Sequence, residues 1–255
     1  LDHRFDFILH PGQWEPALNG TVTSDLDKLL EEWLGHEKPV TILDLSGVPS
    51  SVLTTLIGSI LRIVYEALYW SREKTEGGIH RPLLIVMEEA HRYLSGDKED
   101  GPAANVAKRI AKEGRKYGIG AMVVSQRPAE VDETILSQCG TIFALRISNP
   151  DDRARVKGAL PDNLGGLVGL LPVLRTGEAI VAGEAAKLPV RCRITLPAPD
   201  QRPKSSDPKV SEAWSKKRIA EGYDRVVASW RAQKTFAVTK NLNIVRSPIK
   251  DTPEP

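Results

Sequence analysis

The most constraining feature of this sequence is the run from Leu83 to His91, in which five apolar residues lead directly into two adjacent carboxylates, Glu88 and Glu89. An unbroken apolar run of this length is typical of a strand covered on both faces, as in a parallel α/β sheet. In such sheets ligands bind beyond the carboxyl ends of the strands, which is where Glu88 and Glu89 would lie. Successive side chains there point in different directions. One carboxylate can then hold a hydrated Mg²⁺ while its neighbour orients an attacking water, as nucleoside triphosphate hydrolysis requires.

The same stretch has a second interpretation, in which a core strand precedes a helix whose first turn favours acidic residues because of the helix dipole. Short motifs of this kind also arise by chance. The roles of Glu88 and Glu89 therefore depend on what the rest of the chain offers.

Length and composition indicate a globular protein. A chain of 255 residues with 41% hydrophobic content is enough for one large α/β domain plus an appendage. The net charge of +2 is too small to indicate nucleic-acid binding from composition alone, so any basic surface must be local. Cys139 and Cys192 form no CxxC pair, which favours two small core residues in a reducing compartment. No apolar run approaches the roughly 20 residues of a membrane span and no signal peptide is present, so we expect a cytoplasmic protein without a membrane segment.

Other segments of the chain show the periodicities of strands and helices. We expect further strands at residues 40–45, 119–124 and 141–145, and helices near residues 24–35, 52–72, 103–116 and 131–138. Strands that alternate with helices from residue 40 to about residue 158 predict a parallel, doubly wound sheet. Beyond them, the sequence predicts a hairpin around Gly183, a hinge with Pro and Ser residues, and one or two helices within residues 210–233.

Polar residues at the ends of these elements are candidates for a site. Lys108, Lys112, Arg115 and Lys116 share one side of the helix near residues 103–116, where a solvated charged face is the default interpretation. Arg115 follows a glycine at the end of this helix, so it can reach across an interface. Gln126 follows the strand at residues 119–124, where a neutral amide can contact a γ-phosphate or an attacking water. Capping of the loop by Gln126 is the alternative.

Several motifs in this order resemble the HerA family. They are ILDLSGVP at residues 42–49, IVMEEAH at 85–91, EGRKYGIG at 113–120, SQRP at 125–128 and ILSQC at 135–139. The family consists of hexameric ATPases of the HerA–FtsK group that translocate double-stranded DNA on a RecA-like core. The resemblance implies an α/β fold, namely a RecA-like P-loop ATPase core with a mainly parallel sheet, a β-hairpin and a C-terminal helical extension. Residues 1–200 would form the core from the Walker B motif onward, and residues 201–255 the extension.

The resemblance also implies roles for four residues at an ATP site. Glu88 takes the Walker B position linked to Mg²⁺, and Glu89 takes the position of the catalytic glutamate. Gln126 is similar to the polar sensor. Arg115 is similar to the arginine finger that a neighbouring subunit inserts into the nucleotide site.

One part of the family pattern is missing. No G-x-x-x-x-G-K-[ST] occurs in these residues, so the backbone cradle and the lysine for the β- and γ-phosphates are absent from them. The family carries that loop upstream, after an amino-terminal barrel domain. Together with a first residue that is Leu1 rather than Met, this leads us to expect a carboxyl-terminal portion that is inactive alone. The alternative is a degenerate subunit that has lost ATP binding.

The expected function is that of an ATP-driven DNA translocase or helicase subunit in a homo-hexameric ring. In this family the partner is a NurA-like nuclease in end resection, or an anti-phage defence effector such as a sirtuin-type NADase or another nuclease. A ring-forming scaffold that assembles an effector, with its ATPase secondary or lost, is the main alternative. An ATPase of the ABC or AAA type is a weaker one, because the combination of Gly-Arg-Lys-Tyr-Gly with Ser-Gln-Arg-Pro argues against it.

Overall fold

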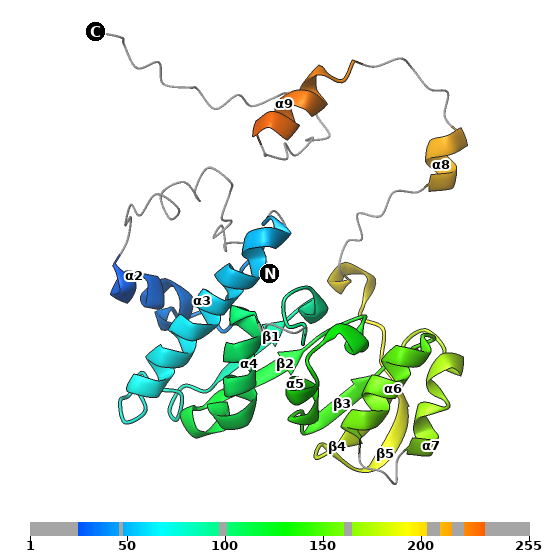
Figure 1. Ribbon diagram of the computed structural model, residues 1–255, viewed down its shortest axis with the longest axis horizontal. Helices are drawn as coiled ribbons and strands as arrows, with labels where there is room; N and C mark the ends of the chain where they lie inside the picture. The colour runs from blue at the N-terminus through cyan, green and yellow to red at the C-terminus, as the bar shows by residue number, and fades with distance from the viewer. Residues whose placement is uncertain are drawn as a thin grey trace. The chain divides into compact units, whose positions relative to one another are not determined.

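The computed structural model describes residues 25–45, 48–96, 101–160, 165–202, 210–215 and 222–232. These residues fall into two compact units, one that ends at residue 202 and one that holds the residues from 210 onward (Figure 1). The candidate site lies in the first unit.

The first described helix, α2 (Leu26–Leu30), continues into a π-helical turn (Glu31–Gly35). Residues 40–45 then run without regular structure, so the strand predicted there is wrong. Val40 and Ile42 are 53% and 58% exposed. A strand needs a neighbour that satisfies its backbone N–H and C=O groups, and no described strand pairs with this segment.

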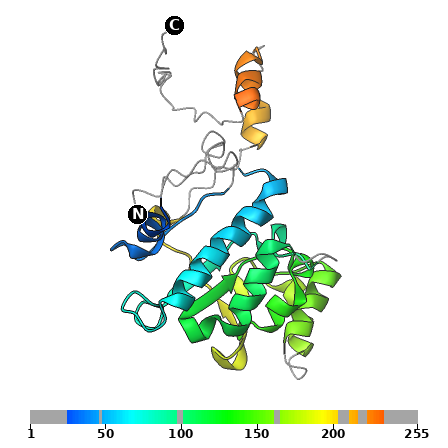
Figure 2. The same ribbon diagram turned by 60° about the vertical axis from the view of Figure 1, so that its left-hand side comes forward.

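Two long helices form a layer, α3 (Ser50–Trp70) and α4 (Pro102–Glu113), and they lie side by side in both views (Figures 1 and 2). Gly58 lies at their closest approach, because a Cβ there would lie 2.7 Å from the Pro102 side chain and 2.8 Å from the Ala103 nitrogen. By length and composition alone α3 would pass as a membrane span. Its apolar side is buried, however, as in the core helix of a folded domain: Leu53, Ile57, Leu61, Val64, Tyr65 and Leu68.

Strands β1 (Leu83–Met87) and β2 (Ile119–Val123) pair in parallel, as predicted, with Leu83 opposite Ile119 and Met87 opposite Val123. Helix α4 contacts β2. The expectation that β1 is covered on both faces is wrong for the described residues. Leu84, Val86 and Met122 share the other face and are 57%, 50% and 45% exposed, because no described element covers them.

The second sheet is antiparallel and has the order β3-β4-β5. Its strands are β3 (Thr141–Ala144), β4 (Glu178–Gly183) and β5 (Ala186–Arg193). The predicted hairpin is therefore confirmed. However, β3 pairs with β4 in the antiparallel sense and does not extend the parallel pair of β1 and β2, because among the described strands its partner is the returning arm of that hairpin.

Short helices lie on either side of β3 in the chain: α5 (Glu133–Ser137), α6 (Pro150–Ala159) and α7 (Gly165–Val168). Asn149 caps α6, since its side chain accepts hydrogen bonds from the Asp151 and Asp152 backbone N–H groups. One face of the antiparallel sheet packs with α6, α7 and the turn at Leu171–Val173. The buried members of this core are Ala144, Val156, Val168, Leu171, Leu174 and Ile180.

The second unit contains α8 (Val210–Ser215) and α9 (Asp224–Ala232), which confirms the predicted helices within residues 210–233. Trp214, Val226 and Trp230 on these helices are all more than half exposed. Residues 1–24 and residues 233–255 lie outside the described residues.

Candidate functional site

The carboxyl ends of β1 and β2 are joined by backbone hydrogen bonds. The Val124 N–H donates to the Met87 carbonyl at 3.0 Å, and the Ala90 N–H donates to the Val124 carbonyl at 3.0 Å. These bonds fix the turn that follows β1 against the turn that follows β2. The acidic pair Glu88–Glu89 is thereby placed next to Ser125 and Gln126.

Glu89 has a left-handed backbone conformation with φ 50° and ψ 40°. It is the only non-glycine residue with positive φ in the part of the chain that the structure describes. Such a conformation costs of the order of 1–3 kcal/mol and tends to occur at functional sites. Hydrogen bonds on either side hold the turn: the Arg92 N–H donates to the Glu89 carbonyl at 2.9 Å, and the Tyr93 hydroxyl donates to the Glu88 carbonyl at 2.8 Å.

The side chains of Glu89 and Gln126, both predicted site residues, contact each other. The Gln126 amide Nε2 donates to Glu89 Oε1 at 2.8 Å. The other carboxylate oxygen, Oε2, lies 3.5 Å from Nδ1 of His91, and the same nitrogen lies 3.2 Å from the Ser125 hydroxyl. Our sequence predictions gave no role to His91 or Ser125, although both belong to the motifs that carried the resemblance.

Glu88 is exposed, and its carboxylate makes no hydrogen bond or ion pair with any described residue. Among the residues described, no group of three or more His, Cys, Asp and Glu side chains is arranged so that it could hold a metal ion. A single free carboxylate still suits Mg²⁺, which keeps several waters and binds one or two carboxylates together with substrate phosphates. The residues present therefore fit a nucleotide-bound Mg²⁺ and not a cage made by protein ligands alone.

Tyr93 holds the turn at Glu88 and Glu89 through the hydrogen bond that its hydroxyl donates to the Glu88 carbonyl. Burial, followed by the negative charges of Glu88 and Glu89, raises the pKa of Tyr93 to about 12. The hydroxyl therefore keeps its proton at neutral pH and remains a donor to the Glu88 carbonyl.

Arg115 lies apart from the other three predicted residues. It is exposed in the 3-10 turn Gly114–Tyr117, which precedes β2, whereas Gln126 follows β2. The four residue steps of β2 span roughly 13 Å at about 3.3 Å per step, so the two side chains lie at opposite edges of the parallel pair. Arg115 makes no ion pair or side-chain hydrogen bond with any of the residues that the structure describes.

An aromatic cluster fixes the turn that carries Arg115. The Tyr117 and Tyr65 rings meet edge to face with centroids 5.7 Å apart. The Arg109 guanidinium lies 4.4 Å from the Tyr65 ring centroid, and the Tyr65 hydroxyl donates to Glu113 at 2.9 Å. Burial, followed by the hydrogen bond to Glu113, raises the pKa of Tyr65 above its ordinary range. These contacts hold the end of α4 in place, and the Arg115 guanidinium is exposed next to it.

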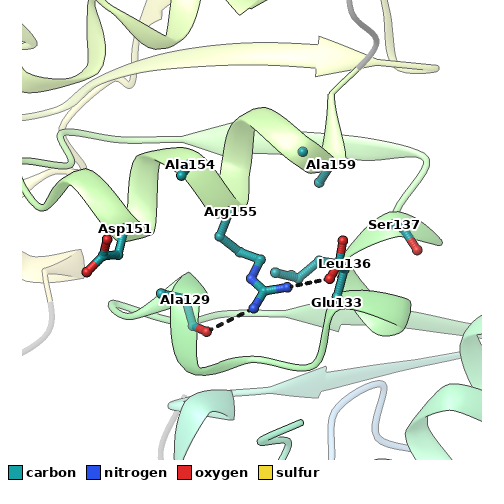
Figure 3. Close-up of a pocket in the computed structure, with 9 residues that line it drawn as sticks. Ala129, Glu133, Leu136, Ser137, Asp151, Ala154, Arg155 and Ala159 are labelled. Carbon is teal, nitrogen blue, oxygen red and sulfur yellow. Dashed lines mark hydrogen bonds and ion pairs between the residues drawn. The ribbon is translucent and has the colours of Figure 1, made fainter.

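A groove of about 500 Å³ lies elsewhere, between α5 and α6 (Figure 3). Arg155 in this groove donates to Glu133 at 3.0 Å and to the Ala129 carbonyl at 3.4 Å. The groove contains none of the four predicted residues. The polar cluster at the ends of β1 and β2, and not this groove, is therefore the candidate site.

Comparison with known proteins extends this picture, although no family model matches the chain. The DNA double-strand break repair helicase HerA of Sulfolobus acidocaldarius is 34% identical over 192 residues, which are 75% of this chain and 38% of that protein. The protein of the same name from Sulfurisphaera tokodaii is 34% identical over 194 residues, with the same two coverages. The chain belongs to the HerA family. The α/β fold class predicted from the HerA resemblance is thereby confirmed.

The chain spans about 38% of the length of these HerA relatives. Among solved structures, the genome packaging NTPase B204 from Sulfolobus turreted icosahedral virus 2, in complex with ATP-gammaS, is similar over 68% of this chain and 73% of that chain. The sequence identity is 11% and the TM-score is 0.48.

Proposed function

We propose that this chain supplies the residues that catalyse ATP hydrolysis at a nucleotide site in a DNA-translocating ring of the HerA family. The observation that carries this proposal is the 2.8 Å contact between Glu89 and Gln126 at the carboxyl edge of two parallel strands. This edge is where ligands bind in such sheets. The contact joins a carboxylate that can take a proton to an amide that can orient a phosphate or a water.

In the proposed reaction Glu89 accepts a proton from the attacking water. The water oxygen attacks the γ-phosphorus, and the bond from that phosphorus to the bridging oxygen breaks, so that ADP and phosphate leave. Gln126 would orient the water or the γ-phosphate, and Glu88 would hold Mg²⁺ through its free carboxylate. A bound Mg²⁺ would neutralise charge that develops on the phosphate oxygens.

Arg115 would complete the site of a neighbouring subunit. Its place at the opposite edge of the parallel pair keeps it from its own Glu89 and Gln126. The aromatic contacts hold the turn that carries Arg115, and the guanidinium makes no ion pair with a described residue. Such a guanidinium can donate hydrogen bonds to negative charge across an interface. This supports an arginine finger in a closed ring, for which a homo-hexamer is the arrangement that the family resemblance implies.

The proposed substrate of translocation is double-stranded DNA, because the relatives are named as helicases of DNA double-strand break repair. We further propose a cytoplasmic protein that works with a nuclease or with a defence effector. A scaffold role, with ATP turnover secondary or lost, is the second candidate, since these 255 residues contain no G-x-x-x-x-G-K-[ST] cradle.

DNA-stimulated ATP hydrolysis by the full-length protein separates the two functions. Wild-type protein should hydrolyse ATP faster when double-stranded DNA is added. Glu89→Gln should bind ATP but lose at least about 10²-fold in turnover, because it keeps the side-chain size and removes the base. Glu76→Gln, which changes an exposed carboxylate outside the site, is the matched control and should remain active.

A wild-type protein that forms rings and recruits its effector without ATP turnover would favour the scaffold. Turnover by Glu89→Gln within twofold of wild type would instead remove Glu89 from the reaction.

A further inference from the structure

The His91 side chain contacts Glu89 of one turn and Ser125 of the other, and it has no part in the proposed function so far. It lies in the 3-10 turn Ala90–Arg92, directly after the strained Glu89. Its side chain is only 15% exposed, whereas that of Glu89 is 44% exposed. The imidazole is therefore fixed in the protein, while the carboxylate remains accessible to a ligand.

The ring nitrogen Nδ1 lies between two oxygens that come from different strand ends. It is 3.5 Å from Glu89 Oε2 and 3.2 Å from the Ser125 hydroxyl oxygen. The same hydroxyl oxygen accepts a hydrogen bond from the Arg127 N–H at 3.0 Å, which fixes Ser125 in turn. Glu89 is thus connected through His91 to the backbone of the turn that carries Gln126.

The position of one proton decides whether this arrangement is attractive. A neutral imidazole carries a proton on one nitrogen and a lone pair on the other. With the proton on Nδ1, the N–H lies on the nitrogen that contacts both oxygens, and it attracts the carboxylate. With the proton on Nε2, the Nδ1 lone pair can accept from the Ser125 hydroxyl but repels the Glu89 carboxylate.

We propose that His91 is a positioning residue for Glu89, with a proton on Nδ1 that is shared between Glu89 Oε2 and the Ser125 hydroxyl. Gln126 holds the other carboxylate oxygen, Oε1, so the plane of the carboxylate is fixed from both sides. Each carboxylate oxygen has two acceptor sites, so one on each remains for a water proton. This inference rests on the proposed function for its kinetic consequence but not for the protonation state of His91.

The kinetic test uses three substitutions in the full-length protein. Asn has a nitrogen or oxygen close to where Nδ1 lies, Gln places its polar atoms further out, near Nε2, and Leu has neither. His91→Leu and His91→Gln should lower kcat by about ten- to a hundredfold. A displacement of about 1 Å in a reacting group can lower the rate by on the order of 10²-fold. The KM for ATP should stay within about twofold, and His91→Asn should recover most of the lost rate.

Equal kcat values for His91→Asn and His91→Gln, or a kcat for His91→Leu within twofold of wild type, would overturn the positioning role. A purely structural role would not separate Asn from Gln in this order. Melting temperatures measured on the same preparations show whether His91→Leu is folded. If His91→Leu is not folded, the comparison of His91→Asn with His91→Gln decides whether His91 positions Glu89.

A second measurement is independent of ATP hydrolysis. A long-range ¹H–¹⁵N spectrum of the full-length protein without ATP reports which nitrogen of His91 carries the proton. A protonated Nδ1, with or without a second proton on Nε2, is the expected result. A proton on Nε2 alone would overturn the inference even if the protein hydrolyses ATP, whereas a wild-type protein without ATP turnover would overturn the proposed function and leave this result standing.

Discussion

At the scale of single residues, Glu89 combines a strained backbone with the side chain on which the proposed chemistry depends. The left-handed turn at φ 50° directs the chain from the end of β1 into the turn that carries His91. Strain of this kind persists only where the surrounding structure holds it, here through the Tyr93 hydroxyl and the pairing of Ala90 with Val124.

This strain leads to a prediction about stability. Glu89→Ala and Glu89→Gly both remove the carboxylate, but only glycine adopts the left-handed conformation without a steric cost. The glycine variant should therefore be more stable than the alanine variant by about 1 kcal/mol in urea unfolding, after the higher entropy of glycine in the unfolded chain is taken into account. An alanine variant as stable as the glycine variant would show that the turn is not strained.

At the scale of elements, one aspartate joins three segments of the first unit. Asp132 caps α5 by accepting hydrogen bonds from the Thr134 and Ile135 N–H groups at 2.9 and 3.3 Å. It also pairs with Lys108 of α4 at 2.9 Å, and its own N–H donates to the Leu94 carbonyl at 2.8 Å. Burial alone would raise the pKa of Asp132, but the Lys108 ammonium and the two capping N–H groups outweigh it and hold the pKa below its ordinary value.

The depressed pKa of Asp132 predicts the sign of a pH dependence. The stabilisation is fully present above the unfolded-state pKa of about 3.9 and is lost as the pH falls through the lower pKa of the folded state. Thermal melts of wild type should therefore show a loss of stability below about pH 4 that is smaller in Asp132→Asn. At pH 7 the Asn variant should be less stable by about 1–3 kcal/mol, because the ion pair between Asp132 and Lys108 is lost. Melts of wild type and the Asn variant that change in parallel with pH would contradict this role.

The contact between α3 and α4 gives a second prediction at this scale. Alanine normally stabilises a helix relative to glycine by about 1 kcal/mol. At Gly58 the added methyl would collide with Pro102 and Ala103, so Gly58→Ala should destabilise the protein by about 1–3 kcal/mol. Gly158→Ala in α6 is the matched control, since nothing lies within 4 Å of a Cβ there, and it should be neutral or stabilising.

If both glycine variants stabilised the chain equally in urea unfolding, the packing of α4 on α3 would be looser than the structure shows.

The sequence predicted the elements whose pattern is local and missed those features that depend on distant partners. The apolar run of β1 and the helix α3 were both recognisable from adjacent residues. Residues 40–45 have the composition of a strand, but a strand forms only beside a partner, and composition does not supply one. Lys108 was expected on a solvated stripe, whereas Asp132, 24 positions later in the sequence, binds it.

The candidate site followed the same rule. Glu88, Glu89 and Gln126 were found because each comes directly after an apolar strand, and parallel pairing brings such positions together. The left-handed conformation of Glu89 carries no local signal, since glutamate does not favour it. The roles of His91 and Ser125 depend on the register of β1 against β2, which the two motifs taken separately do not show.

At the scale of the whole molecule, the described residues hold only part of what an ATP site needs. They contain the carboxylates, the amide and the guanidinium, but no phosphate cradle. The apolar face formed by Leu84, Val86 and Met122 is also uncovered within them. Because this chain spans about 38% of its HerA relatives, the decisive experiment uses the full-length protein.

The central claim is that Glu89 of one subunit and Arg115 of the next form one composite site. Full-length Arg115→Ala and Glu89→Gln proteins should each form rings, bind ATP and fail to hydrolyse it, because an arginine finger contributes on the order of 10³-fold or more in rate. Arg115→Lys should recover little of that rate, because an ammonium group cannot reproduce the guanidinium fork.

Mixing the two inactive proteins tests this claim most directly. Where an Arg115→Ala subunit presents its intact Glu89 to the intact Arg115 of a Glu89→Gln neighbour, one complete site forms, so ATP hydrolysis should return in part. The measurement is the ATP turnover of mixed rings, with rings of each single variant as controls and with mixing verified by mass spectrometry. Turnover above both controls is the predicted result, and turnover that stays at background in rings shown to be mixed would contradict the composite site.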